Sequence, residues 1–175
     1  MYGQDTIVRY LQDAEAAERT FEDALAALSK TGGQAEVQSA LTDMSRKSRG
    51  HYERLKARIE ELGASRSTAK SALAHALGFA PRLAQLGETP DQRSTQDLMI
   101  MIGAAAAGSA MYEALATAAS AAGDAVTEQL ARQLENEEQQ DYQQAAALLR
   151  QSAVETFQRA MHDNVAAGSA PLAAN

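Results

Sequence analysis

The 175-residue sequence contains no cysteine and no tryptophan, and only three prolines. Without cysteine the chain has no disulfide bridge, no thiolate metal ligand and no cysteine nucleophile. A reducing compartment is compatible with this composition, so the cytoplasm is the expected location. The N-terminus also lacks a basic leader followed by an apolar run, and we therefore expect no secretion.

Positive charge is also scarce, because 16 basic residues face 23 acidic ones and the formal net charge is -7. A protein that binds phosphate backbones needs a basic face, so we expect no nucleic-acid partner. Residues 98–122 contain Glu113 as their only charged residue and are long enough to span a bilayer. Most of this stretch is alanine, glycine, serine and threonine, which gain little from lipid. We therefore expect a helix buried in a bundle and no membrane span.

Helix-forming residues dominate the stretches between the few glycines and prolines. The pattern predicts four long helices, at residues 5–30, from about Val37 to Gly63, at 95–122 and at 124–165. The long connection between the second and third helices contains a short helical piece near 68–86. At about 1.5 Å per helical residue this connection can cross the bundle from end to end, which lets the third helix run parallel to the second. The prediction is an all-α four-helix bundle over residues 1–165 in up-down-down-up order, with a loose tail over 166–175.

Polar residues at apolar seam positions are the candidates for function, because burying an unpaired charge costs free energy. The spacing of the first helix places Glu18 in the bundle interior. The second helix places Ser48 and His51 inside, with Lys47 about one turn from His51. On the fourth helix Glu137 and Asp141 share the apolar face, with Glu138 at its edge. A rotation of one residue would exchange Glu137 for Glu138, so both remain candidates.

Carboxylates and histidine converging from several helices are what a di-iron or di-manganese centre needs. That centre uses a glutamate from each of two helices and a Glu-x-x-His motif from each of the other two. Here Ser48 stands three residues before His51, and Glu138 to Asp141 reads Glu-x-x-Asp. The middle of the third helix offers alanine and glycine, and Tyr112 as a residue that can hydrogen-bond a buried carboxylate. The sequence therefore predicts only part of a two-metal centre.

Three motifs carry a resemblance to a known family. Residues 11–18 match a Leu-x-Asp-x-x-x-Ala-Glu opening, residues 51–55 a His-x-x-Arg-Leu segment, and residues 134–141 a Leu-x-x-Glu-x-x-x-Asp segment. In these motifs, and over nearly its full length, the chain resembles the bacterial YciE/YciF-type ferritin-like stress proteins. The resemblance implies a ferritin-like bundle that binds iron, a stress-response setting and a dimeric assembly. It also implies that Glu18 is a metal ligand.

Two departures from the family pattern concern the metal itself. The family has a glutamate where this chain has Lys47, and a Glu-His-Tyr-Glu block where this chain has residues 105–108. Lys47 would bring an ammonium group to a place where a cation binds. We expect Lys47 to replace metal charge by pairing with Glu18, Glu137 or Glu138.

Two functions follow as hypotheses. The first is a non-enzymatic, stress-associated bundle, a homodimer without a cofactor, whose two-metal site is degraded or absent and which acts by self-association or partner binding. The alternative is a di-iron protein that oxidises ferrous iron or reduces peroxide. Its remaining metal ligands would be Glu18, His51, Glu137, Glu138 and Asp141. Binding to a membrane surface through the amphipathic helix around Phe157 ranks last.

Overall fold

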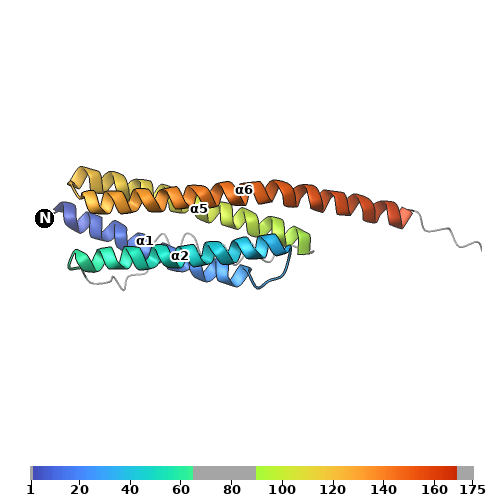
Figure 1. The fold of residues 1–175 in the computed structure, drawn as a ribbon, viewed down its shortest axis with the longest axis horizontal. Helices are drawn as coiled ribbons and strands as arrows, with labels where there is room; N and C mark the ends of the chain where they lie inside the picture. The colour runs from blue at the N-terminus through green and yellow to red at the C-terminus, as the bar shows by residue number, and fades with distance from the viewer. Residues whose placement is uncertain (1, 65–89, 169–175) are drawn as a thin grey trace, which may run out of the picture.

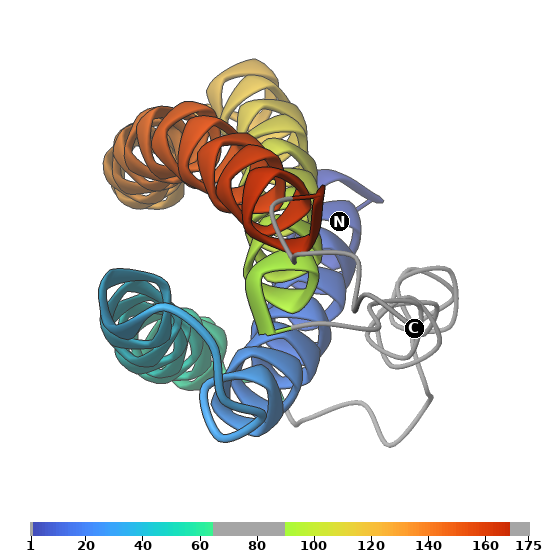
Figure 2. The same ribbon diagram turned by 90° about the vertical axis from the view of Figure 1, so that its right-hand side faces the viewer.

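The computed structural model describes residues 2–64 and 90–168. They form four helices, α1 (Tyr2–Leu28), α2 (Ala35–Glu61), α5 (Pro90–Ala122) and α6 (Ala125–Gly168), and no strand occurs in these two ranges. Figure 1 shows that α1 and α2 form one antiparallel hairpin and α5 and α6 another. The two hairpins pack side by side, as the view along the bundle shows (Figure 2). Because α2 and α5 run in the same direction, the predicted up-down-down-up order is confirmed.

The helix boundaries agree with the prediction to within a few residues at most ends. The third helix begins earlier than predicted, at Pro90, and proline is favoured in the first turn of a helix because its missing N–H has no partner there. The fourth helix continues to Gly168, a few residues beyond its predicted end at 165. Alanine follows Val165 twice, and alanine extends a helix readily. The predicted short helix near 68–86 and residues 169–175 lie outside the described residues.

A glycine and a helix cap build the turn between α5 and α6. Gly123 ends α5 with a φ of 72°, a left-handed conformation that favours glycine. Asp124 then caps α6, because its carboxylate accepts a hydrogen bond from the Thr127 backbone N–H at 3.0 Å. Arg58 near the end of α2 donates to the same carboxylate at 2.9 Å. This contact ties the end of the first hairpin to the turn of the second.

The apolar core consists of two clusters separated along the bundle axis. The cluster near the α1–α2 turn contains Phe21, Leu25, Leu41, Met44, Leu98, Met101 and Ala145. The cluster near the α5–α6 turn contains Ile7, Leu11, Leu55, Ile59, Tyr112, Leu115 and Leu134. On α1, α2 and α6 a buried charged or ionisable residue falls between the two clusters, namely Glu18, His51 and Glu138. The bundle therefore has a polar layer near its middle.

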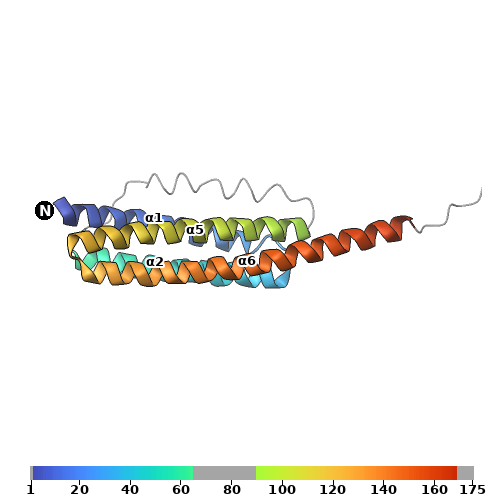
Figure 3. The ribbon, with the colours of Figure 1, turned by 90° about the horizontal axis from the view of Figure 1, so that it is seen from above.

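Helix α5 supplies much of the apolar core. Over Gln92–Ala122 it is long and apolar enough to cross a membrane by length and composition, and 44% of its most apolar window is buried inside the bundle. A buried helix of a bundle has the same properties, and α5 packs between α6 and α1. The end of α6 differs, because it continues past the other three helices (Figures 1 and 3). Three large apolar side chains are exposed along this end, Val154, Phe157 and Met161.

Two glycine substitutions in or next to α5 test the account of the turn. Gly123→Ala should lower the free energy of unfolding by about 1 kcal/mol, because alanine is strained at positive φ. Gly103→Ala in the same helix should raise it by about 0.5–1 kcal/mol, since the added carbon meets no atom outside its own helix within 4 Å and alanine is the better helix former. Urea denaturation measures both values. Equal effects of the two substitutions would contradict the account.

Candidate metal centre

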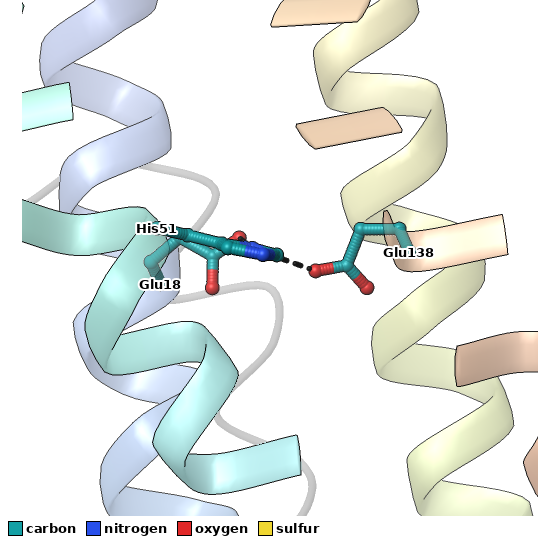
Figure 4. A group of neighbouring side chains, drawn as sticks. All are labelled: Glu18, His51 and Glu138. Carbon is teal, nitrogen blue, oxygen red and sulfur yellow. Dashed lines mark hydrogen bonds and ion pairs between the residues drawn. The ribbon is translucent and has the colours of Figure 1, made fainter. Parts of the chain in front are cut away.

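Three buried side chains from three helices meet in the polar layer. Glu18 comes from α1, His51 from α2 and Glu138 from α6, and all three are buried. Each offers one ligand atom, and the three atoms lie within 4.8 Å of one another. Figure 4 shows Glu138 reaching toward His51 and Glu18 from the opposite hairpin. The arrangement is a candidate metal-binding group of two carboxylates and one imidazole.

Both ring nitrogens of His51 face carboxylates. Nδ1 lies 3.3 Å from Glu18 Oε1 and 3.2 Å from Glu138 Oε1, and Nε2 lies 3.1 Å from Glu137 Oε2. Arg54, one helical turn after His51, donates from its two terminal nitrogens to the Glu137 carboxylate at 2.9 and 2.8 Å. Because Glu137 is held in this way, it fixes the orientation of the imidazole ring.

This environment changes the pKa of two groups in the centre. Burial alone would lower the pKa of His51, but hydrogen bonds and charge from Glu138 and Glu18 raise it to about 10. Burial raises the pKa of Glu138 to about 7, with the charges of Glu18 and Asp141 adding to the effect and His51 opposing it. The metal-free centre therefore holds protons at neutral pH where a cation could bind.

Tyr112 from α5 completes the contacts of Glu18. Its buried hydroxyl donates a hydrogen bond to Glu18 Oε1, so the expectation that Tyr112 bonds a buried carboxylate is confirmed. Its ring packs edge-on against His51, with the ring centres 5.9 Å apart. Burial and the negative charge of Glu18 raise the pKa of the hydroxyl, so Tyr112 stays a donor.

Three carboxylate oxygens near the centre are buried without a hydrogen-bond partner. They are Glu18 Oε2, Glu138 Oε2 and Asp141 Oδ2. An unpaired buried acceptor costs about 1–3 kcal/mol, and more when it carries charge. The free oxygens of Glu18 and Glu138 belong to two of the three candidate ligands. They are therefore available for a cation bound by these two residues and His51.

The structure corrects the expected partner of Lys47. Its ammonium pairs with Asp141 on α6, and the predicted pairing with Glu18, Glu137 or Glu138 was wrong. Lys47 is 40% exposed, because it lies on the flank of α2 and reaches the edge of the centre from there. His51 already occupies the space among the three glutamates. Asp141 therefore forms an ion pair with Lys47 that is separate from the group of Glu18, His51 and Glu138.

The structure also decides between Glu137 and Glu138. Glu138 is 2% exposed and faces the interior, whereas the Glu137 side chain is 37% exposed at the edge. The expectation that Glu138 lies at the edge of the apolar face was therefore wrong. The buried residues of α6 alternate in steps of four and three, Thr127, Ala131, Leu134, Glu138, Asp141 and Ala145, whereas the expected seam took the step of three from Leu134 and so selected Glu137.

The residues present do not fit a pair of metal ions. A two-metal centre needs carboxylates at four positions on four helices. Here α2 has buried Ser48 three residues before His51, and α5 presents Gly108 and Tyr112 to the centre. Asp141, a ligand candidate for the second position, is bound to Lys47. The two carboxylates and one imidazole that converge fit one ion.

The fold and the polar layer define a ferritin-like helical bundle, with one candidate metal-binding group in its interior. Residues 3–161 match the family described as Domain of unknown function (DUF892), and the chain belongs to this family. None of the curated proteins matches the sequence.

Solved structures show the same fold. The stress protein YciF of E. coli is 20% identical, with a TM-score of 0.79 over 86% of this chain and 96% of that one. A protein of Xanthomonas campestris pv. campestris is 19% identical, with a TM-score of 0.75 over 92% and 99% of the two chains. YcfI of Rhodopseudomonas palustris is 18% identical, with a TM-score of 0.76 over 82% and 92%. The predicted resemblance to YciE/YciF-type proteins is confirmed.

Removing the Tyr112 hydroxyl tests its contact with Glu18. Tyr112→Phe should lower the free energy of unfolding by about 1–3 kcal/mol, because a buried carboxylate loses its donor while the ring stays in place. Tyr142→Phe on α6 is the matched control, since Tyr142 is 44% exposed, and it should change stability by less than about 0.5 kcal/mol. Urea denaturation of the metal-free proteins measures both, and equal values would contradict the contact.

The raised pKa values predict how stability depends on pH. The pKa of His51 rises from 6.5 in the unfolded chain to about 10, and that of Glu138 rises from 4.5 to about 7. Between pH 4.5 and about 7 for Glu138, and between pH 6.5 and about 10 for His51, the folded state holds more protons than the unfolded state. The free energy of unfolding of the metal-free protein should therefore fall as pH rises through these ranges. The His51 contribution is fully present below pH 6.5 and is lost as pH rises through 10.

Urea denaturation at several pH values between 7 and 9 measures this slope. His51→Gln should flatten the slope, because glutamine does not titrate, whereas the exposed His162→Gln should leave it unchanged. A wild-type stability that rises with pH over this range would contradict the assignment of protons to the centre.

Proposed function

We propose that this protein is a ferritin-like bundle that binds a single divalent transition-metal ion at Glu18, His51 and Glu138. The carrying observation is that these three buried side chains converge from three helices while Glu18 Oε2 and Glu138 Oε2 have no hydrogen-bond partner. Two carboxylates and one imidazole suit iron, manganese, cobalt or zinc. We do not propose oxidation of iron by a metal pair, because residues 2–64 and 90–168 bring only one group of candidate ligands together.

Each residue of the centre has a separate part in this proposal. Glu18 and Glu138 would supply oxygen ligands and His51 would supply Nδ1, the nitrogen that faces both carboxylates. Glu137 would accept a hydrogen bond from Nε2–H of His51, which leaves Nδ1 as the ligand atom. Arg54 holds Glu137 in place. A bound ion would supply Lewis acidity and, if it is iron or manganese, a redox couple.

The second position of a ferritin-like centre would hold the Lys47 ammonium instead of a metal ion. Its pairing with buried Asp141 supports this part of the proposal. A lysine at this position contributes positive charge without a metal. The charge of Asp141 is compensated whether or not the first position is loaded.

A second candidate function needs no metal. Both ring nitrogens of His51 face carboxylates, which is the arrangement of a doubly protonated imidazole that neutralises buried negative charge. In that case the protein is a metal-free bundle that acts by self-association or partner binding.

In both candidates we propose a homodimer in the cytoplasm, in a stress response, without nucleic acid and without a membrane span. The acidic charge and the absence of cysteine support the location and the lack of nucleic acid.

Metal content tests the proposal directly. After anaerobic loading with Fe²⁺ or Co²⁺ and removal of free ions, we expect one bound ion per chain by inductively coupled plasma mass spectrometry. His51→Gln should weaken binding by at least about tenfold, since it removes one of three ligands. His162→Gln removes an exposed histidine on the same chain and should leave the metal content unchanged.

Lys47→Glu tests why a single ion is expected. It frees Asp141 and adds a carboxylate, so the metal content should rise above one ion per chain. Two ions in the wild-type protein would contradict the proposal, and no ion in either protein would favour the metal-free candidate.

A further inference from the structure

Gly108 on α5 lies directly against the carboxyl group of Glu138. A Cβ atom built on Gly108 would lie 2.8 Å from Glu138 Cδ, 3.0 Å from Cγ and 3.1 Å from Oε2. Separations below 3.0 Å are shorter than van der Waals contact allows, so the two groups cannot both keep these positions. Glu138 therefore takes its place only because α5 exposes bare backbone at residue 108.

The same helix contains a second glycine that has no such contact. Gly103 is exposed, and apart from its chain neighbours and the backbone of its own helix no atom lies within 4 Å of a Cβ built there. Glycine inside a helix destabilises it relative to alanine, so an interior glycine calls for a local reason. At Gly108 that reason is the Glu138 side chain, which extends from α6 to within 3.2 Å of His51 Nδ1.

We propose that Gly108 is a positioning residue for the metal centre, because its missing side chain leaves the room through which Glu138 reaches His51. This inference rests on the proposed metal site, and it explains why Glu138 can serve as the third ligand. Residues 105–108 read Ala-Ala-Ala-Gly, so at these positions α5 offers small residues that leave room for Glu138 from α6. A methyl group at 108 would meet only side-chain atoms of Glu138 among the closest contacts, so we expect the Glu138 side chain to move and the helices to stay in place.

The first test compares Gly108→Ala with Gly103→Ala in a Co²⁺ titration at fixed pH. Gly108→Ala should weaken Co²⁺ binding by about tenfold or more and change the visible absorption spectrum, because one ligand is displaced. Gly103→Ala should leave affinity and spectrum unchanged. Circular dichroism should show both variants folded with unchanged helix content, which separates a shift of Glu138 from loss of structure.

A double-mutant cycle tests whether Gly108 acts through Glu138. In the Glu138→Ala background, adding Gly108→Ala should cause no further loss of Co²⁺ affinity, because the side chain that would be displaced is already absent. Additive losses would overturn the inference.

A metal-free measurement keeps this inference separate from the proposed function. The ¹⁵N shifts of the His51 ring report on the carboxylate next to Nδ1, so Gly108→Ala should move them toward the values of Glu138→Ala, and Gly103→Ala should not. If the wild-type protein binds no Co²⁺, the proposed function fails and these shifts alone decide the inference. Ring shifts in Gly108→Ala that equal those of the wild type would overturn it.

Discussion

Two buried carboxylates facing one imidazole are the constraint on which the rest of this bundle depends. Glu18 and Glu138 come from opposite hairpins and lie where a bundle of this size would otherwise bury apolar side chains. Charge removed from water must be compensated by protons, cations or hydrogen-bond donors. Here the single Nδ1 of His51 faces both carboxylates, and Tyr112 donates to Glu18. The two apolar clusters on either side hold the helices in the register that brings these groups together.

The same constraint links the centre to its surroundings. Glu137 and Arg54 form an ion pair at the edge of the bundle, and this pair orients His51. Lys47 and Asp141 form a second ion pair next to the polar layer. Each pair leaves the three candidate ligands free of competing cations. Lysine and arginine thus compensate Asp141 and Glu137, and Glu18, His51 and Glu138 remain together in the polar layer.

Much of the fold follows from the sequence alone. Helix-forming residues between few glycines predict the four helices, and the length of the second-to-third connection predicts the parallel α2 and α5. Seam spacing places Glu18, Ser48 and His51 in the interior, as observed. Spacing does not distinguish Glu137 from Glu138, because residues three and four positions after Leu134 both lie near the same helix face. The partner of Lys47 and the contact of Gly108 with Glu138 depend on packing between helices, although the small residues of α5 do indicate room for a bulky neighbour. Arg54 was not among the predicted site residues, although its position one helical turn after His51 indicates that it could reach the same carboxylates.

The central proposal is that the polar layer holds one metal ion and not two. Anomalous X-ray diffraction from crystals of the wild-type protein grown with Mn²⁺ or Co²⁺ measures the number and position of ions directly. The account predicts one peak, bounded by Glu18, His51 and Glu138 with oxygen and nitrogen ligands at about 2.0 to 2.3 Å, and a Lys47 ammonium still paired with Asp141. Two peaks in the layer, or one peak on Asp141 with Lys47 displaced, would contradict it.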